Sequence, residues 1–225
     1  MLPRILPFAI YMAFLALAEG VAWLSRTLPA LASWGPAADL WLYPAKTAVV
    51  LGALVYFWPR YKELKGRAFD GAKDALVAAA VGLVVYLAWV RMDWPWAMQG
   101  VPIGYDPFRT GDELGVVLAG IRLFGAVVVV PVMEELFWRS FLLRYLVNSQ
   151  FEAIRIGTFT AFSFVATIVL FGLEHDLWLA GMLAGLAYTV LLYRTGRLWP
   201  CILAHAVTNL ALGIHVLATG EWQWW

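Results

Sequence analysis

Charged residues are scarce in this chain. Asp, Glu, Lys and Arg make up 14% of its 225 residues, hydrophobic residues make up 63%, and the mean hydropathy is +0.75. A soluble domain is nearer half apolar and a quarter charged, and a single core does not bury so much apolar surface. The composition therefore argues against an ordinary soluble domain and indicates a protein dissolved in a lipid bilayer, with membrane lipids as partners.

Basic runs and cysteines are also rare. The formal net charge is +1, and no basic run is interleaved with aromatic residues, so we expect no nucleic-acid partner. The single cysteine, Cys201, excludes an internal disulfide and a multi-cysteine metal site. Cys201 lies in an apolar segment, and we interpret it as a small buried hydrophobic residue.

Long apolar segments alternate with turns along the whole chain. A helix needs ~20 mostly apolar residues to cross the hydrocarbon layer. Seven segments fit this description, at 5–24, 40–58, 74–91, 114–133, 156–173, 177–193 and 199–218. The stretch 133–147 follows the fourth segment and carries four charges, so it is either the deep end of one long helix or a separate helix. We predict an all-α, polytopic transmembrane helical bundle with seven to eight helices.

The chain shows no linker, internal repeat or second domain. We therefore expect one integral membrane domain over 1–225, with the residues that carry chemistry in a core at about 114–218. Residues 16–18 resemble a signal-peptide cleavage site. Because the apolar run continues beyond them through Trp23 and Leu24, we expect the first segment to be a retained helix.

The basic residues are unevenly distributed between the loops. The loop after the second segment carries the densest cluster, namely Arg60, Lys62, Lys65, Arg67 and Lys73. Positively charged loops of membrane proteins tend to remain in the cytoplasm. This loop and the amino terminus are therefore predicted to be cytoplasmic.

Two adjacent carboxylates occur within the apolar part of the chain, in the sequence Glu134-Glu135-Leu-Phe-Trp-Arg139. An ionisable side chain in a span costs several kcal/mol unless it is paired or functional. On a helix, Glu135 and Arg139 are four residues apart and lie on one face, where they can form an ion pair. Glu134 points about 100° away from that face. It is therefore left free to act as a general base.

Two histidines and an asparagine complete a possible hydrolytic site. His175 follows a long apolar run, and His205 and Asn209 share one helical face at a spacing of four residues. Each alone is typical of a hydrogen-bonded packing residue. Together they can orient a water molecule for Glu134 and donate hydrogen bonds to a tetrahedral oxyanion.

These residues form three ordered motifs, EELFWR, FGLEH and HAVTN. The set resembles the EExxxR, FxxxH and HxxxN motifs of the CAAX-protease and bacteriocin-processing (CPBP, or ABI) family, whose best-known member is the type II CAAX prenyl endopeptidase. The resemblance spans roughly 130–212, and Ser140 stands where many members have Gly. The chain is also similar to the CAAX-protease-like proteins that accompany bacterial exosortase systems.

The resemblance implies a metal-independent intramembrane glutamate-type peptidase. Glu134 and His175 would activate water, His205 and Asn209 would form the oxyanion hole, and Glu135 and Arg139 would support them. The substrates would be prenylated or other membrane-associated peptides, no cofactor is implied, and the location would be a bacterial inner membrane. One expectation conflicts with this site, because simple alternation of the spans puts His175 and His205 near opposite membrane faces.

Two other classes of protein remain open. A zinc hydrolase could use Glu134, His175 and His205 as ligands, although the chain has no HExxH motif. A non-enzymatic membrane protein, such as an immunity factor or scaffold, would need none of this chemistry. A transporter would show inverted repeats, which are not visible.

A further pair of charges, Glu19 and Lys46, lies outside these motifs. The predicted spans put both residues at a similar depth on adjacent antiparallel helices. One hypothesis is that each side chain reaches the headgroups alone, as long side chains near span ends do. The sharper hypothesis is an interhelical ion pair that sets the register of the first two helices.

Overall fold

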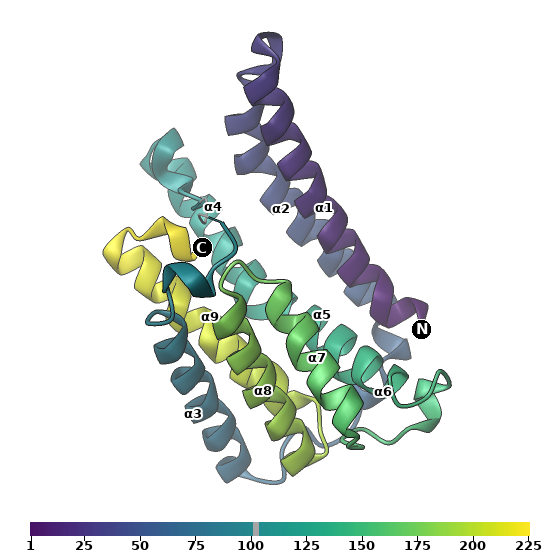
Figure 1. Ribbon diagram of the computed structural model, residues 1–225. Coiled ribbons are helices and arrows are strands. Elements are labelled where there is room, and N and C mark those ends of the chain that lie inside the picture. The colour runs from purple at the N-terminus through teal and green to yellow at the C-terminus, as the bar shows by residue number, and fades with distance from the viewer. Residues whose placement is uncertain (101–103) are drawn as a thin grey trace.

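All elements of the described chain are helical. The computed structural model describes residues 1–100 and 104–225, apart from the side chains at positions 36, 37, 39 and 110 (Figure 1). No strand occurs in these ranges. The main helices are α1 (Leu2–Thr27), α2 (Trp34–Phe57), α3 (Ala72–Trp89), α4 (Asp112–Phe124), α5 (Val130–Glu135), α6 (Leu143–Tyr145), α7 (Ala161–Leu173), α8 (Trp178–Thr195) and α9 (Trp199–Thr219). The predicted all-α fold is confirmed.

Helices α4, α5 and α6 form one continuous helix. Two π-helical segments, Gly125–Val129 and Leu136–Leu142, join them into a single apolar helix over Asp112–Tyr145. The stretch 133–147 is therefore the deep end of a long helix, which was one of the two predicted alternatives. A π-helical segment shifts the backbone hydrogen bonds and often occurs at a functional site.

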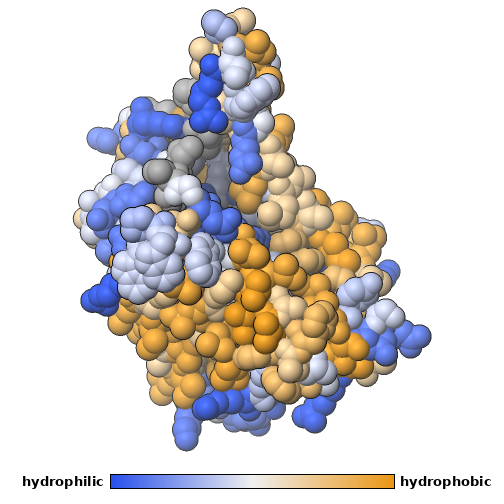
Figure 2. All heavy atoms as spheres, viewed as in Figure 1, coloured by the Kyte–Doolittle hydropathy of each residue, from blue (hydrophilic) through white to orange (hydrophobic). Residues whose placement is uncertain are grey.

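The described helices have the length and surface of membrane spans. Five segments are long and apolar enough to cross a membrane: Leu2–Thr27, Leu40–Arg60, Ala72–Trp89, Asp112–Tyr145 and Trp199–Thr219. Large apolar side chains such as Leu76, Val84 and Val116 are exposed on them. Figure 2 shows a broad apolar surface on the body of the molecule, with hydrophilic side chains above and below it. The chain is an integral membrane protein.

The fifth predicted segment is shorter than expected. Helix α7 contains 13 residues and begins at Ala161, five residues after the predicted start of the segment. Gly157 has a positive φ of 81°, a backbone conformation that is incompatible with a right-handed helix at this position. Thr160 is the N-cap of α7, because its side-chain oxygen accepts a hydrogen bond from the Ser163 backbone amide. Helix α7 alone is too short to cross a bilayer.

The helices pack as neighbouring pairs around the long helix (Figure 1). Helices α1 and α2 lie side by side on one flank, α3 packs along α9, and α7 packs along α8. Gly82 of α3 allows one close approach, because a Cβ atom there would lie 2.3 Å from the Ala204 carbonyl oxygen of α9. Gly172 of α7 allows another, where a Cβ atom would lie 2.7 Å from the Trp178 carbonyl oxygen of α8.

A cluster of charged side chains around the buried Arg4 holds the beginning of α1 against two loops. Arg4 donates from Nε to Glu63 Oε1 at 2.7 Å and from Nη1 to Glu152 Oε1 at 3.1 Å. Ser140 also donates to Glu63, and Arg144 Nη2 donates to Ser140 Oγ at 2.8 Å. Burial opposes ionisation of Glu63, but the hydrogen bonds from Arg4 and Ser140 outweigh it and lower the pKa of this carboxyl.

The predicted ion pair between Glu19 and Lys46 is wrong. The Lys46 side chain is buried, and its Nζ lies 3.9 Å from the ring centroid of Tyr11 and 4.8 Å from that of Tyr43. Glu19 is exposed on α1. Lys46 therefore turns towards the aromatic rings between α1 and α2, where cation–π contacts take the place of the carboxylate.

Candidate active site

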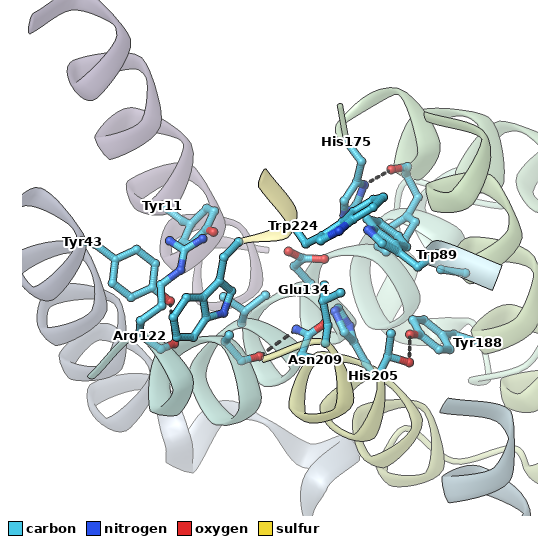
Figure 3. A pocket seen from close by; sticks show the side chains of 17 residues that line it. Tyr11, Tyr43, Trp89, Arg122, Glu134, His175, Tyr188, His205, Asn209 and Trp224 are labelled. Carbon is cyan, nitrogen blue, oxygen red and sulfur yellow. Dashed lines mark hydrogen bonds between the residues drawn. The ribbon is translucent and has the colours of Figure 1, made fainter. Parts of the chain in front are cut away.

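The predicted site residues surround one cavity in the helical body. The cavity has a volume of about 170 Å³ and is lined by side chains from α1, α2, α3, the long helix, α7, α8, α9 and the carboxyl-terminal tail (Figure 3). Glu134, His175, His205 and Asn209 all line it. Residues from three separate segments of the sequence therefore meet in one place.

Glu134 has a carboxylate oxygen without a protein partner. The residue is 5% exposed, and its Oε2 accepts no hydrogen bond from any described residue. It lies near the end of α5, and its side chain points into the cavity (Figure 3). A carboxylate in this position can accept a proton from a small molecule that enters the cavity.

Glu135 and Arg139 form the ion pair that their spacing predicts. Arg139 Nη1 lies 3.0 Å from Glu135 Oε1, and both side chains are fully buried. The Arg139 guanidinium also lies 4.2 Å from the centroid of the Phe171 ring. The same carboxylate oxygen lies 3.0 Å from His205 Nδ1. This second contact joins the long helix to α9, and helical spacing does not reveal it.

The contact with Glu135 constrains the protonation of His205. An ionised carboxylate accepts hydrogen bonds, so His205 Nδ1 carries the proton in this pair. The His205 ring stacks on the Tyr188 ring, with 5.2 Å between centroids and 21° between planes. Tyr188 in turn donates to Thr208 Oγ1 at 2.7 Å, and Thr208 donates to the Gly82 carbonyl oxygen at 2.9 Å. These contacts hold the ring in one orientation and leave Nε2 for the cavity.

His175 is oriented by its own helix. Its Nδ1 lies 2.7 Å from the Phe171 carbonyl oxygen, which can only accept a hydrogen bond. Nδ1 therefore carries the proton in the neutral ring, and Nε2 is an acceptor. The Phe171 ring lies 4.8 Å from the His175 ring and 6.4 Å from the His205 ring, measured between centroids.

The expected separation of His175 and His205 does not occur. Both rings line the same cavity and approach the same Phe171 ring. Helix α7 is short, and the close contact at Gly172 folds α8 tightly back on it. His175 therefore follows a helix that ends beside the cavity, and the assumption of equal full-length spans was wrong.

Asn209 uses one of its two amide hydrogens to bind the long helix. Its Nδ2 donates to the Ala126 carbonyl oxygen at 2.7 Å. Ala126 lies in the π-helical segment Gly125–Val129, in which carbonyl groups lose their usual helical partners. The second amide hydrogen is not used by any described residue, so it can serve a ligand in the cavity.

Two further features of the site were not predicted. Glu174 accepts a hydrogen bond from Trp138 Nε1 at 3.0 Å, which gives this neighbouring carboxylate a fixed partner. Arg122 lines the cavity together with Tyr11, Tyr43 and Trp225. The sequence could have indicated Arg122, because it lies near the middle of an apolar segment, where a charged side chain is costly unless it is paired or functional.

The described residues hold no ready metal site. No group of three or more His, Cys, Asp or Glu side chains in the described ranges is arranged to hold a metal ion. Glu134, His175 and His205, the three ligands considered for a zinc hydrolase, therefore do not form such a group in this geometry.

Comparison with known proteins points to the same part of the chain. The family model described as type II CAAX prenyl endopeptidase Rce1-like matches residues 117–211, a range that contains Glu134, His175, His205 and Asn209. No curated protein and no solved structure matches the chain. Over residues 117–211 the chain is thus similar to the Rce1-like type II CAAX prenyl endopeptidases, and the family resemblance predicted from the three motifs is confirmed.

Proposed function

We propose that the chain is an intramembrane glutamate-type endopeptidase that hydrolyses a peptide bond with water activated by Glu134. The family match supports a CAAX-type intramembrane protease. The observation that carries the finer proposal is the unpartnered Glu134 oxygen in a cavity that also contains two imidazole rings and an amide. A structural carboxylate at this depth would be paired, as Glu135 is.

The proposed first step forms the nucleophile. A water molecule binds between the Glu134 carboxylate and His175 Nε2, which accepts one of its hydrogen bonds. Glu134 takes a proton from this water while the oxygen attacks the carbonyl carbon of the substrate. His175 is a positioning group in this step, since the Phe171 carbonyl oxygen holds its Nδ1 proton.

The second step collapses the tetrahedral intermediate. Its negative oxygen accepts hydrogen bonds from His205 Nε2 and from the free amide hydrogen of Asn209. Glu134 then returns its proton to the leaving nitrogen, the C–N bond breaks, and a carboxylic acid and an amine are released. Donation by His205 Nε2 requires the doubly protonated ring, because Nδ1 already donates to Glu135.

We further propose that the reaction needs no metal ion or cofactor and that the substrate is a peptide or lipidated peptide. The cavity lies among membrane-spanning helices, which suits a substrate that arrives from the bilayer. The clustered basic residues between α2 and α3 support an amino terminus on the cytoplasmic side of a bacterial inner membrane. The single integral domain over 1–225, with its catalytic core at about 114–218, belongs to the same proposal.

Hydrolysis of a peptide panel by the purified protein tests this function. The protein is incubated in detergent with the panel, with and without a metal chelator, and products are identified by mass spectrometry. Wild-type protein should cleave in both conditions, whereas Glu134→Gln protein should not cleave. If the wild-type protein binds stoichiometric zinc, and His175→Ala loses both the zinc and the activity, the protein is instead a zinc hydrolase. Full activity of Glu134→Gln would refute the assignment of Glu134 as the base.

A further inference from the structure

The chain turns back towards the bundle after the end of α9. Gly220 follows the helix with a positive φ of 73°, and its amide donates to the Val216 carbonyl oxygen at 2.8 Å. Glycine in this left-handed conformation commonly ends a helix. The segment 220–225 then returns towards α4 and contains one 3₁₀ turn, Trp222–Trp224 (Figure 1). This segment lies beyond residues 117–211, where the chain resembles the protease family.

Two tryptophans of this segment line the cavity that contains Glu134. The Trp224 and Trp225 side chains both face the cavity, and Figure 3 shows Trp224 among the side chains around Glu134. The Nε1 atoms of both indoles are buried without a hydrogen-bond partner among the described residues. A buried N–H group that has lost its hydration and gained no acceptor costs free energy. Displacement of the segment would relieve this cost, because both indoles would regain hydrogen-bond partners in water.

Aromatic contacts hold the inner side of the segment. The Trp225 ring stacks on the Trp222 ring, with 5.9 Å between centroids and 25° between planes. The central carbon of the Arg122 guanidinium lies 5.8 Å from the Trp225 ring centroid. The same carbon lies 4.2 Å from the centroid of the Tyr43 ring and 5.3 Å from that of Tyr105. Ring faces attract the positive charge without a hydrogen bond, so these contacts can separate and form again.

A close backbone approach and an exposed ion pair hold the outer side of the segment. A Cβ atom at Gly104 would lie 2.4 Å from the Trp222 carbonyl carbon. The Trp222 ring lies 5.9 Å from the Phe108 ring, measured between centroids. His215 Nε2 lies 2.8 Å from Glu221 Oε2, but the Glu221 side chain is 47% exposed, and exposed ion pairs contribute little to stability. The segment can therefore leave the bundle without unfolding α9.

The cavity is too small for a peptide while the segment covers it. Its volume is about 170 Å³, whereas pockets for small organic ligands usually measure about 300–1,000 Å³. An extended peptide of four residues is already about 13–14 Å long. Most other lining side chains belong to helices that pack along one another, and close-packed helices resist displacement. The segment 220–225 is therefore the part of the cavity wall that moves most easily.

We propose that the segment 220–225 is an autoinhibitory lid. Trp224 and Trp225 occupy the path by which a peptide reaches Glu134, and a substrate enters only after the lid has been displaced. The identity of the substrate rests on the proposed peptidase function, whereas the movement of the lid does not. The lid would restrict hydrolysis to peptides whose apolar side chains replace the two indoles in the cavity.

Alkylation of a cysteine inside the cavity tests the lid without relying on catalysis. Ala126 lines the cavity, so a water-soluble maleimide should modify the thiol of Ala126→Cys protein in detergent only when the lid is open. In this background, Trp222→Ala and Gly104→Ala disturb the closed lid from outside the cavity, because neither residue lines it. Each should raise the alkylation rate roughly tenfold, which corresponds to about 1.4 kcal/mol, the scale of one aromatic contact.

Matched substitutions separate lid opening from general loosening. Gly120→Ala, with no atom within 4 Å of its Cβ, and Trp34→Ala, at the exposed start of α2, should leave the rate unchanged. Cys201 is fully buried, so its alkylation in any variant reports unfolding. Ala184 also lines the cavity, and Ala184→Cys replaces Ala126→Cys if the latter protein does not fold.

Two results would overturn the lid. The first is an equal alkylation rate in the parent, Trp222→Ala and Gly104→Ala proteins. The second is a parent rate as fast as that of free cysteine, which would show that the cavity is already open.

Hydrolysis distinguishes an inhibitory lid from a wall that binds substrate. With Ala126 unchanged, Trp222→Ala should raise kcat/KM for the peptide panel roughly tenfold, whereas Trp34→Ala should not change it. A lower kcat/KM together with faster alkylation would overturn the inhibitory role. Faster alkylation without hydrolysis by any protein would refute the peptidase and retain the lid, whereas hydrolysis with equal alkylation rates would do the reverse.

Discussion

Replacing Glu135 with glutamine tests how far the centre of the bundle depends on one negative charge. Glu135 Oε1 is shared by Arg139 Nη1 and His205 Nδ1, each at 3.0 Å, and the Glu135 side chain is fully buried. Glutamine keeps an oxygen in about the same place but removes the charge. The Arg139 guanidinium is then left buried without a counter-ion.

The size of the effect follows from what Arg139 retains. Removing one partner of a buried ion pair costs about 3–5 kcal/mol in the free energy of unfolding. Arg139 keeps the Phe171 ring face at 4.2 Å and a long contact with the Gly185 carbonyl oxygen at 3.4 Å. The glutamine oxygen also still accepts a hydrogen bond. We therefore expect Glu135→Gln to lower the free energy of unfolding by about 2–3 kcal/mol.

The adjacent residue provides a matched control. Glu134 is buried to a similar degree, but it forms no ion pair with any described residue, whereas Glu135 pairs with Arg139 through its Oε1. Glu134→Gln should therefore leave the stability unchanged or raise it slightly, because a buried charge is removed without breaking an ion pair. Both variants are unfolded by denaturant in the same detergent, and midpoints and slopes are compared with wild type. Equal stability of the two variants would refute the different roles assigned to the two carboxylates.

Three other outcomes are expected from the same structure. Glu134→Gln should reduce the rate of peptide hydrolysis by at least about 10²–10⁴-fold, as measured by product formation, because no general base remains. Gly82→Ala should destabilise the protein by about 1–3 kcal/mol, because its Cβ would lie 2.3 Å from the Ala204 carbonyl oxygen, whereas Gly52→Ala, with no atom within 4 Å, should not. Because the folded-state pKa of Glu63 is lowered, this carboxylate contributes fully to stability above its ordinary pKa of about 4.3, and the contribution is lost as the pH falls through the lowered value. The unfolding temperature of wild type should therefore fall more steeply with decreasing pH than that of Glu63→Gln. Parallel curves for the two proteins would contradict this account.

The local parts of the site are encoded by helical spacing. The four-residue spacing of Glu135 and Arg139 predicts a contact that the structure contains at 3.0 Å. The same spacing puts His205 and Asn209 on one face of α9, from which both line the cavity. These contacts depend only on the period of the helix, so they follow from the sequence without knowledge of neighbouring helices. The catalytic roles of these residues remain predictions.

Contacts between helices were not predictable in this way. The bond from His205 to Glu135 and the rings around Arg122 depend on how deeply and at what rotation each helix packs. That arrangement is set by short helices and by close approaches such as the one at Gly82, which hydropathy does not specify. For the same reason Lys46 meets Tyr11 instead of Glu19. Composition and helical period thus determined that the chain is a membrane protein and which side chains share a helical face. Tertiary packing decided which faces meet, because side-chain volumes and close backbone contacts fix the relative depth of the helices.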